Sequence, residues 1–436
     1  MADSFEERLE RLRRAQGDPG MMLLIGVDFL LDAHPTAQRA RLRAALEAAA
    51  VPHWFDAAVL GKLLDEPEDV AQELVDVLQK LPIVEPFPRL GSVAFNVHEA
   101  TRLAIRQQLL SENPDRLRLL SARALEAAES GTEFHVVAER LYHSFCAQPE
   151  KAADECEARS EDWVGSALIE EAHTLRLFLE ELETTGMVTG RPRAEVLLLT
   201  GWIRLFRDEA SLYPSAATIA LDLARAAAHP STTARALCFV AAAEKARGRL
   251  ARAEEHYEEA IALLEQIVES DHRTGCSRSL AAAYTGLGDV LQAQGRLGDA
   301  LASFHKDLEI SEHLAQLDPA NAGWQRDLAW TYHHLAALRR EAGNLGAAGS
   351  LCRKEVAIYR RLVASEPNEP EMLHSLSRAL HAFASLEAAS GKRSRARALS
   401  AESLRILDQL IKQRPERDDW QNERRIMQEL HSRVGG

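Results

Sequence analysis

One spacing in the C-terminal part of the chain constrains its fold more than any other feature. Residues of the same kind return every 48 positions in five separate registers. The registers are Pro319, Pro367 and Pro415; Gly295, Gly343 and Gly391; Ala300, Ala348 and Ala396; Trp324, Met372 and Trp420; and Tyr284, Tyr332 and Leu380. A fixed period of this length is typical of repeat proteins, in which each unit buries its apolar face against the next. A stack of similar units is therefore predicted.

Each unit is predicted to be a pair of helices. Gly295 separates two amphipathic segments, 281–295 and 296–317, and a glycine in this place allows the left-handed backbone that ends a helix. Small residues on the facing sides let the two helices approach closely. The 436 residues include only 23 Gly and 16 Pro and are rich in Ala and Leu, which also favours helix.

The first clear unit resembles the tetratricopeptide repeat family. Its segment "AAAYTGLGDVLQAQGRLGDALASF" carries residues at the spacing of that family, namely Tyr284, Leu287, Gly288, Leu291, Gly295, Ala300 and Phe304. Neighbouring units keep part of the pattern, at Gly248, Ala253 and Tyr257, at Tyr332, Leu335, Gly343 and Ala348, and at Phe383, Gly391 and Ala396. The resemblance implies an all-α, right-handed superhelical solenoid of helical hairpins, with four units in residues 232–436.

The units are longer than is usual in that family, whose period is about 34 residues. We expect the second helix of each unit to be extended before the recurring proline. A last helix near residues 420–433 is expected to cap the stack. Residues 116–231 carry apolar residues at helical spacing without a clean repeat, so irregular hairpins of similar kind are predicted there.

Residues 50–115 follow a different pattern. Two short helical segments precede two β-rich pieces on either side of the turn-forming residues 88–92, and a helix near 98–110 follows. This order, with the phrase "LQKLPIVEPF…FNVHEATRLAIRQQLL", resembles the winged-helix segment that precedes the repeats of bacterial signal-transduction (STAND-type) ATPases. The sequence contains no ATPase module. Residues 1–49 are expected to form helices that either pack on this segment or dock another subunit.

Charge and cysteine content restrict the environment of the chain. The net charge of −14 weakens a general role in binding nucleic acid or anionic membranes. The five cysteines are odd in number and never form CxxC, so neither a disulfide framework nor a zinc site is expected, and a reducing cytoplasm fits best. The apolar run 21–31 contains Asp28 and falls short of the roughly 20 residues that span a bilayer. With no cleavage pattern beside it, no export signal is expected.

No motif for catalysis, a cofactor or a metal stands in a suitable context. Gly61-Lys62 is followed by Leu63, and no GxxxxGK[ST] pattern for a phosphate-binding loop occurs. His143 and Cys146 form the one close Cys/His pair, and a helix-face histidine beside a partly buried cysteine is the simpler interpretation. His333 and His334 are adjacent, so on a helix they diverge by about 100° and cannot share a metal. We expect no enzyme activity, no cofactor and no metal.

DNA binding through the winged-helix segment is disfavoured by charge. Its second helical stretch, 65–76, would enter the groove in a helix-turn-helix reader. That stretch contains no Lys or Arg and repels phosphates through its acidic residues, which are Asp65, Glu66, Glu68, Asp69, Glu73 and Asp76. A structural or protein-docking role is expected. The alternative is a transcription-associated regulator that uses the hairpin residues Arg89 and His98.

The resemblance to tetratricopeptide repeats also implies where a ligand would bind. Ligands of that family lie on the concave face, which is lined by the first helix of each unit. The shared glycine and alanine positions place seven candidate contact residues there: Lys245, Asp289, Gln292, His333, Arg340, Arg378 and His381. They do not reproduce the Lys/Asn/Arg clamp with which some members hold a C-terminal carboxylate, so a chaperone-tail adaptor is disfavoured.

The C-terminal repeats differ in charge from the rest of the chain. Residues 318–436 carry 19 Lys+Arg against 15 Asp+Glu, although the whole chain is acidic. Basic pairs recur there at Arg339-Arg340, Arg353-Lys354, Arg360-Arg361 and Lys392-Arg393. One interpretation is a set of solvated helix faces. The other is a basic surface that docks an acidic segment of a partner.

These patterns predict a non-catalytic scaffold or adaptor that binds another protein or a peptide. Resemblance to the signal-transduction ATPases implies a regulatory subunit of a bacterial signalling or defence system. No nucleic-acid or membrane partner is expected, and the partner and oligomeric state are left open. Two alternatives are a winged-helix DNA-binding regulator and an enzyme with an unfamiliar site around His135, His143 and Cys146.

Overall fold

The structure is a computed structural model that describes residues 5–87, 93–128, 134–166, 169–206, 214–271, 274–367, 369–415 and 417–435. The chain divides into two compact units. Unit 1 comprises residues 1–157 and 169–200, and unit 2 comprises residues 158–168 and 201–436. Apart from one two-stranded sheet, the described elements are helices, so the predicted all-α class is confirmed. The finer division at residues 49, 115 and 231 stays a prediction.

The first part of the chain forms eleven described helices and the sheet. The helices are α1 (Phe5–Arg14), α2 (Pro19–Asp32), α3 (Thr36–Ala49), α4 (Ala57–Leu64), α5 (Glu68–Leu78), α6 (Glu99–Glu112), α7 (Pro114–Ala127), α8 (Phe134–Ala147), α9 (Pro149–Ser166), α10 (Ile169–Thr185) and α11 (Gly190–Phe206). The strands are β1 (Val84–Phe87) and β2 (Ala94–Val97). The division between the units falls within α9 and within α11.

The β-hairpin lies where the sequence predicts it. Strands β1 and β2 pair antiparallel, with Val84 opposite Val97 and Phe87 opposite Ala94. The predicted turn at 88–92, with Arg89, lies outside the described residues. The order α4, α5, hairpin, α6 matches the predicted order of elements.

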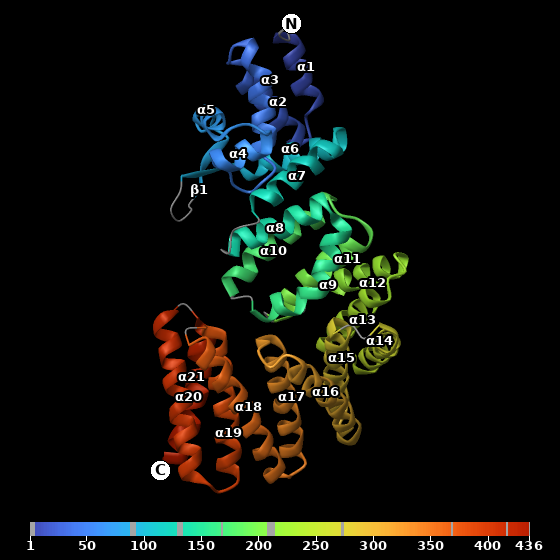
Figure 1. Ribbon diagram of the computed structural model, residues 1–436, viewed down its shortest axis with the longest axis vertical. Coiled ribbons are helices and arrows are strands. Elements are labelled where there is room, and N and C mark those ends of the chain that lie inside the picture. Colours follow the sequence, from blue (N-terminus) through green and yellow to red (C-terminus); the bar gives the residue numbers. More distant parts are fainter. Residues whose placement is uncertain are drawn as a thin grey trace. The chain divides into compact units, whose positions relative to one another are not determined.

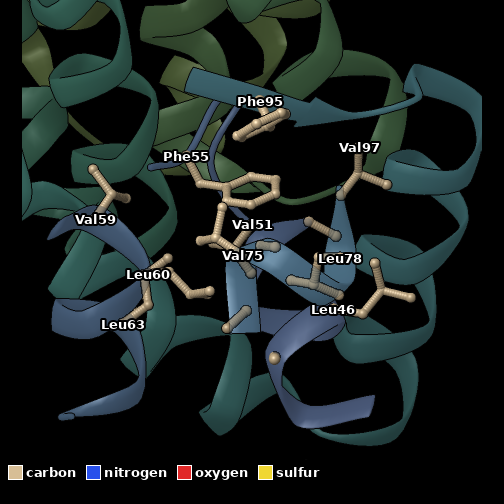
Figure 2. Packing of buried hydrophobic residues seen from close by; sticks show 14 of the residues in the cluster. Leu46, Val51, Phe55, Val59, Leu60, Leu63, Val75, Leu78, Phe95 and Val97 are labelled. Carbon is tan, nitrogen blue, oxygen red and sulfur yellow. The ribbon is translucent and has the colours of Figure 1, made fainter. Parts of the chain in front are cut away.

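The core of unit 1 holds these elements together (Figure 2). Leu46 of α3, Leu60 of α4 and Leu78 of α5 are almost fully buried in the same cluster. The ring of Phe55, which precedes α4, lies 6.2 Å from the ring of Phe95 in β2, and the two residues also form a backbone bridge. Each large apolar side chain buried in this way contributes about 1.5–3 kcal/mol to stability, so the hairpin is fixed by packing as well as by its strand pairing.

Unit 2 is a succession of helical hairpins (Figure 1). Its helices are α12 (Pro214–Ala226), α13 (Pro230–Ala246), α14 (Leu250–Asp271), α15 (Thr274–Ala293), α16 (Leu297–Leu317), α17 (Ala322–Glu341), α18 (Leu345–Ser365), α19 (Pro370–Ala389), α20 (Arg393–Gln413) and α21 (Asp418–Gly435). From α12 to α21 each helix packs on the next one along the chain. We call α13, α15, α17 and α19 the first helices and α14, α16, α18 and α20 the second helices.

The turn between the two helices of each hairpin is the same in successive units. Gly248, Gly295, Gly343 and Gly391 all adopt a positive φ, between 73° and 79°. In this left-handed conformation the chain reverses within a few residues, and only glycine adopts it without steric cost. The 48-residue period therefore corresponds to one helical hairpin, as predicted.

First and second helices contact each other at positions where one of the two helices carries glycine or alanine. A Cβ added to Gly288 would lie 2.6 Å from the ring of Phe304, and one added to Gly286 would lie 2.3 Å from the ring of Tyr257. Ala300 and Ala348, which begin the second helices, are completely buried. Small residues at these positions are thus required by the distance between the helices.

The last described helix, α21, packs against the end of the last hairpin. Helix α21 packs on α20 and buries Trp420 and Met427. Its other side is polar, with Arg425 and Glu429 as an exposed pair. The capping function predicted for it stays a prediction. In the described part of the chain, no helix combines the length and the hydropathy needed to cross a membrane.

The close contact at Gly288 can be tested with Gly288→Ala. The added methyl group would collide with Phe304, and overpacking of this kind costs about 1–3 kcal/mol, so we expect a lower midpoint of thermal unfolding by circular dichroism. Gly298→Ala is the matched control, because a Cβ there meets no atom within 4 Å. That control is expected to be neutral or stabilising by up to about 1 kcal/mol. Equal midpoints for the two variants would show that the helices do not approach as described.

Candidate functional site

The predicted contact residues all lie on first helices of unit 2. Their positions recur with the 48-residue period, so that Thr285, His333 and His381 correspond, as do Gln292 and Arg340. We call this surface the first-helix face and define it by the residues that follow. It comprises Lys245 on α13; Ala282, Thr285, Asp289 and Gln292 on α15; Trp330, His333, Ala337 and Arg340 on α17; and Arg378, His381, Ser385 and Ala388 on α19.

One pair among the seven predicted residues is in direct contact. Lys245 Nζ donates to Asp289 Oδ2 at 2.6 Å, and His334 Nδ1 lies 3.1 Å from the other oxygen of Asp289. Burial alone would raise the pKa of Asp289, but His334 and Lys245 outweigh it and lower that pKa. The Asp289 carboxylate is therefore held ionised between two first helices of neighbouring units.

Other contacts of this kind join residues that are 49 positions apart. Gln292 Nε2 donates to Glu341 at 2.8 Å, and Arg278 Nε donates to Asp327 at 2.5 Å. His374 Nε2 lies 2.7 Å from Glu423. The spacing is one more than the period, so each contact runs from one unit to the next. The three carboxylates in these contacts, Asp327, Glu341 and Glu423, were not among the predicted contact residues. Their spacing of 49 positions from a polar partner could have indicated them.

The centre of the face is an exposed tryptophan beside two histidines. Trp330 is 44% exposed and its ring stacks on His333, with centroids 5.6 Å apart and planes at 18°. His334 meets the same ring edge-on at 5.0 Å. His333 is itself held by the buried Glu355, whose Oε1 lies 3.1 Å from its Nδ1. The indole therefore packs against both imidazoles while part of its ring stays exposed.

Trp330 was not among the contact residues predicted from the sequence, although it stands 48 residues before the predicted Arg378 and so occupies the same position of the repeat.

Arg340 and Arg378 are exposed and, among the described residues, have no hydrogen-bond or salt-bridge partner. His381 is partly buried, and this burial lowers its pKa despite the nearby charge of Glu423. The structure brings none of these three residues into direct contact with the other predicted ones.

A second cluster of polar side chains lies inside unit 1 and centres on Arg106 of α6. Its guanidinium is fully buried. Nε donates to the carbonyl of Ala50 at 2.9 Å, one terminal nitrogen donates to the Tyr142 hydroxyl at 2.9 Å, and Glu181 and the Val51 carbonyl also accept from it. A buried charge needs such a complete set of partners to be tolerated.

His53 connects the two carboxylates of this cluster. Its Nδ1 lies 3.0 Å from Glu139 Oε1 and its Nε2 lies 3.4 Å from Glu181 Oε2. Its ring stacks on Phe178 at 3.6 Å. Burial would raise the pKa of both carboxyls, yet His53 with His143 lowers that of Glu139, and Arg106 with His53 and Arg102 lowers that of Glu181. Both carboxylates are ionised in the folded unit.

The geometry around Cys146 does not favour a catalytic thiolate. Burial raises the pKa of the Cys146 thiol to about 12, and its sulfur lies 3.8 Å from the sulfur of Met187. Burial also lowers the pKa of His143, whose Nε2 lies 3.1 Å from Glu139. His135 packs edge-on against Trp54. His143 and Glu139 therefore belong to the buried network around Arg106, and Cys146 lies at its edge beside Met187.

Helix α5 is acidic on its exposed side. In α5 the acidic residues Glu68, Asp69, Glu73 and Asp76 are exposed, so this helix presents negative charge to solvent. Among the residues that the structure describes, no group of three or more His, Cys, Asp or Glu side chains could hold a metal ion.

Comparison with known families identifies tetratricopeptide repeats in the chain. The model of that family matches residues 233–274 and 280–319, which correspond to α13 with α14 and α15 with α16. The resemblance predicted from the segment between Tyr284 and Phe304 is therefore confirmed for this part. No curated protein matches the chain.

Several solved structures are similar. The Signal Transduction ATPase with Numerous Domains protein with a tetratricopeptide repeat sensor from Pyrococcus horikoshii has a TM-score of 0.55 and 13% identity, over 96% of this chain and 59% of that one. BtubC from P. vanneervenii has a TM-score of 0.40 and 18% identity, over 58% and 91%. A Rap protein complexed with Competence and Sporulation Factor has a TM-score of 0.41 and 12% identity, over 86% and 96%.

The likeness to the ATPase shows a shared fold. It confirms the predicted helical solenoid of tetratricopeptide type, and this chain spans about three fifths of that protein's length. It does not identify residues 50–115 as a winged helix, which stays a prediction.

The buried carboxylates of unit 1 make a specific pH dependence testable. Because the folded-state pKa of Glu181 lies below the unfolded value of about 4.3, its stabilisation is complete above about pH 5 and is lost as the pH falls. Glu181→Gln leaves Arg106 without its charged partner and is expected to destabilise unit 1 by about 3–5 kcal/mol at pH 7. Thermal unfolding should show that this variant loses less stability between pH 7 and pH 3 than the wild type does. The exposed Glu126→Gln is the control and should keep the wild-type pH profile.

The thiol of Cys146 is expected to resist alkylation. A thiol whose pKa is about 12 is almost entirely protonated at pH 7.5, and the thiolate is the reactive form. We expect no labelling of Cys146 by iodoacetamide in the native protein within the time that labels the urea-unfolded protein completely, as followed by mass spectrometry. Rapid native labelling would contradict the raised pKa of this thiol and would favour the enzyme alternative.

Proposed function

We propose that this chain is a non-catalytic scaffold whose first-helix face binds a peptide or a segment of a partner protein. The observation that carries the proposal is Trp330, a large apolar side chain left exposed in the middle of a polar face and held in place by His333 and His334. Exposed aromatic residues with a fixed orientation are typical of the anchor points of protein interfaces.

The repeat architecture supports this proposal energetically. Each hairpin of unit 2 packs on the next, so the first-helix face exists before a ligand binds. A preformed surface loses little conformational entropy on binding, and more of the contact energy then appears as affinity. We also propose that the partner segment is acidic, since residues 318–436 carry 19 Lys+Arg against 15 Asp+Glu.

The biological setting is proposed by analogy. The similar ATPase from Pyrococcus horikoshii carries its tetratricopeptide repeats as a sensor. The sequence of this chain has no phosphate-binding loop. By analogy with that sensor, we propose a cytoplasmic regulatory subunit of a bacterial signalling or defence system, which passes on a binding event to an effector.

Photo-crosslinking in the native host tests the proposed face. Ala282 is exposed on the first helix α15, at the position that corresponds to Trp330, and Ala302 is exposed on the second helix α16. We expect p-benzoylphenylalanine at Ala282 to crosslink one partner protein near stoichiometry, identified by mass spectrometry. The same group at Ala302 is the matched control and is expected to crosslink none.

Two outcomes would contradict the proposal. Crosslinks from Ala302 alone would place binding on the second helices. Failure of Ala282 to capture any protein, in a strain where the tagged chain is correctly folded, would argue against a scaffold that uses the first-helix face.

A further inference from the structure

Two helical faces outside the first-helix face carry charge of one sign. The first belongs to the second helices α18 and α20. Helix α18 contains four Lys or Arg residues and α20 contains five, and all of them are exposed. We call them the basic second-helix face, which comprises Arg353, Lys354, Arg360, Arg361, Arg393, Arg395, Arg397, Arg405 and Lys412.

The carboxylates of α18 and α20 do not offset this charge. Glu355 is buried beneath the surface. Glu402 accepts from Arg360 at 2.7 Å, and Asp408 accepts from Arg424 of α21 at 2.5 Å. Because Arg360 belongs to α18 and Glu402 to α20, their contact also shows that the two second helices lie side by side. The charge left without a partner on this face is therefore positive.

Three of the cations form a stripe along α20. Arg397, Arg405 and Lys412 are eight and seven residues apart, so they lie within about 80° of one another around the helix and about 12 Å and 10.5 Å apart along its axis. In the described part of the chain none of the three has a hydrogen-bond or salt-bridge partner. Exposed residues beside them are small, such as Ala398 on α20 and Ala357 on α18. A helix of another molecule can therefore approach the stripe closely.

The second face is the exposed side of α5 in unit 1. This helix contains no Lys or Arg and exposes Glu68, Asp69, Glu73 and Asp76, which we call the acidic face of α5. The first three of these residues have no hydrogen-bond or salt-bridge partner among the residues that the structure describes. Asp76 accepts from two glutamine amides, which are neutral. The negative charge of this face is thus also left without a partner.

The spacing of the carboxylates on α5 matches that of the cations on α20. Glu68 and Asp76 are eight residues apart and Asp69 and Asp76 are seven, which again gives about 12 Å and 10.5 Å along the axis. With Asp76 opposite Arg405, a second carboxylate meets Arg397 if the two helices are parallel, and Lys412 if they are antiparallel. Two ion pairs can therefore form in either direction.

We infer that a second copy of this chain docks its acidic face of α5 on the basic second-helix face, so that copies associate head to tail. The inference goes beyond the proposed function, because neither face contains a residue of the first-helix face. A phosphate backbone would also be attracted to the basic second-helix face, but a second copy accounts for the acidic face of α5 as well.

The contact joins two different surfaces, so it leaves one free face of each kind on every dimer. Association therefore continues beyond two copies. Among the described residues, no large apolar side chain is exposed on α5, α18 or α20. The contact consequently depends on exposed ion pairs, which are individually weak and are screened by salt.

Sedimentation velocity of the full-length chain tests the inference. At low salt we expect the sedimentation coefficient to rise with protein concentration past the value for a dimer. In about 1 M salt, where the Debye length is only about 3 Å, it should return to the value for the monomer.

Two variants then reverse the charge of one face each. The first combines Glu68→Lys, Asp69→Lys and Glu73→Lys, and the second combines Arg397→Glu, Arg405→Glu and Lys412→Glu. Each alone is expected to sediment as a monomer at concentrations at which the wild type associates. Mixed in equal amounts they should associate again, because the reversed faces fit each other and the two unchanged faces do so as well. Such recovery also shows that both variants fold.

A matched control reverses the same number of carboxylates elsewhere. Glu255→Lys, Glu258→Lys and Glu269→Lys together change exposed residues of α14 and should leave association as in the wild type. The inference is overturned by a chain that stays monomeric at all concentrations, by association that survives both reversals, or by a mixture that does not recover. If the chain assembles only with an added DNA duplex, and reversal of the cations alone abolishes this, the occupant is a nucleic acid and not a second copy.

Discussion

The stack of unit 2 depends on close contact between the two helices of each hairpin. In the hairpin of α15 and α16, the hydrogen of Gly288 faces the ring of Phe304, and in the next hairpin Ala336 and Cys352 hold the corresponding positions. The distance between helices is then set by hard contact, and dispersion attraction across such contacts is lost steeply if the helices separate. A left-handed glycine at each turn repeats the same geometry in the next unit. Every first helix therefore contributes to one continuous surface.

Polar contacts also join neighbouring units of this apolar framework. Apart from Arg278, which is buried, the side chains in these pairs are at least partly exposed, and such pairs contribute only about 0–1 kcal/mol each, so they do not account for the stability of the stack. Their effect is on the surface charge. Lys245 neutralises Asp289 and Arg278 neutralises Asp327, whereas Glu341 keeps its charge because its partner Gln292 is a neutral amide. Arg340 and Arg378 have no hydrogen-bond or salt-bridge partner among the described residues. An acidic chain thus presents a locally basic surface.

Much of the fold could be predicted from the sequence, because helical periodicity and a regular period are local patterns. The hairpins, the turn glycines and the β-hairpin of residues 84–97 follow from such patterns. The side chains of the candidate site were only partly predictable. Trp330 looks like an ordinary apolar helix residue until its exposure is known. The cluster around Arg106 joins residues up to 128 positions apart, between His53 and Glu181, and no local signal connects them.

The contacts between residues 49 positions apart make the repeats of this protein non-interchangeable. Removal of one 48-residue unit would leave the turn glycines and the alanines that begin the second helices in equivalent places, since Gly295, Gly343 and Gly391 and Ala300, Ala348 and Ala396 share the period. The polar pairs would be broken. With residues 297–344 removed, Arg278 would face Ser375 in place of Asp327, and Gln292 would face Ala389 in place of Glu341. The polar side chains of each unit therefore form these pairs with the unit that follows it in the natural order. The order of the units is thus specified by their polar side chains. Recombination between units of such a gene would conserve the fold and disrupt the arrangement of charges on its surface.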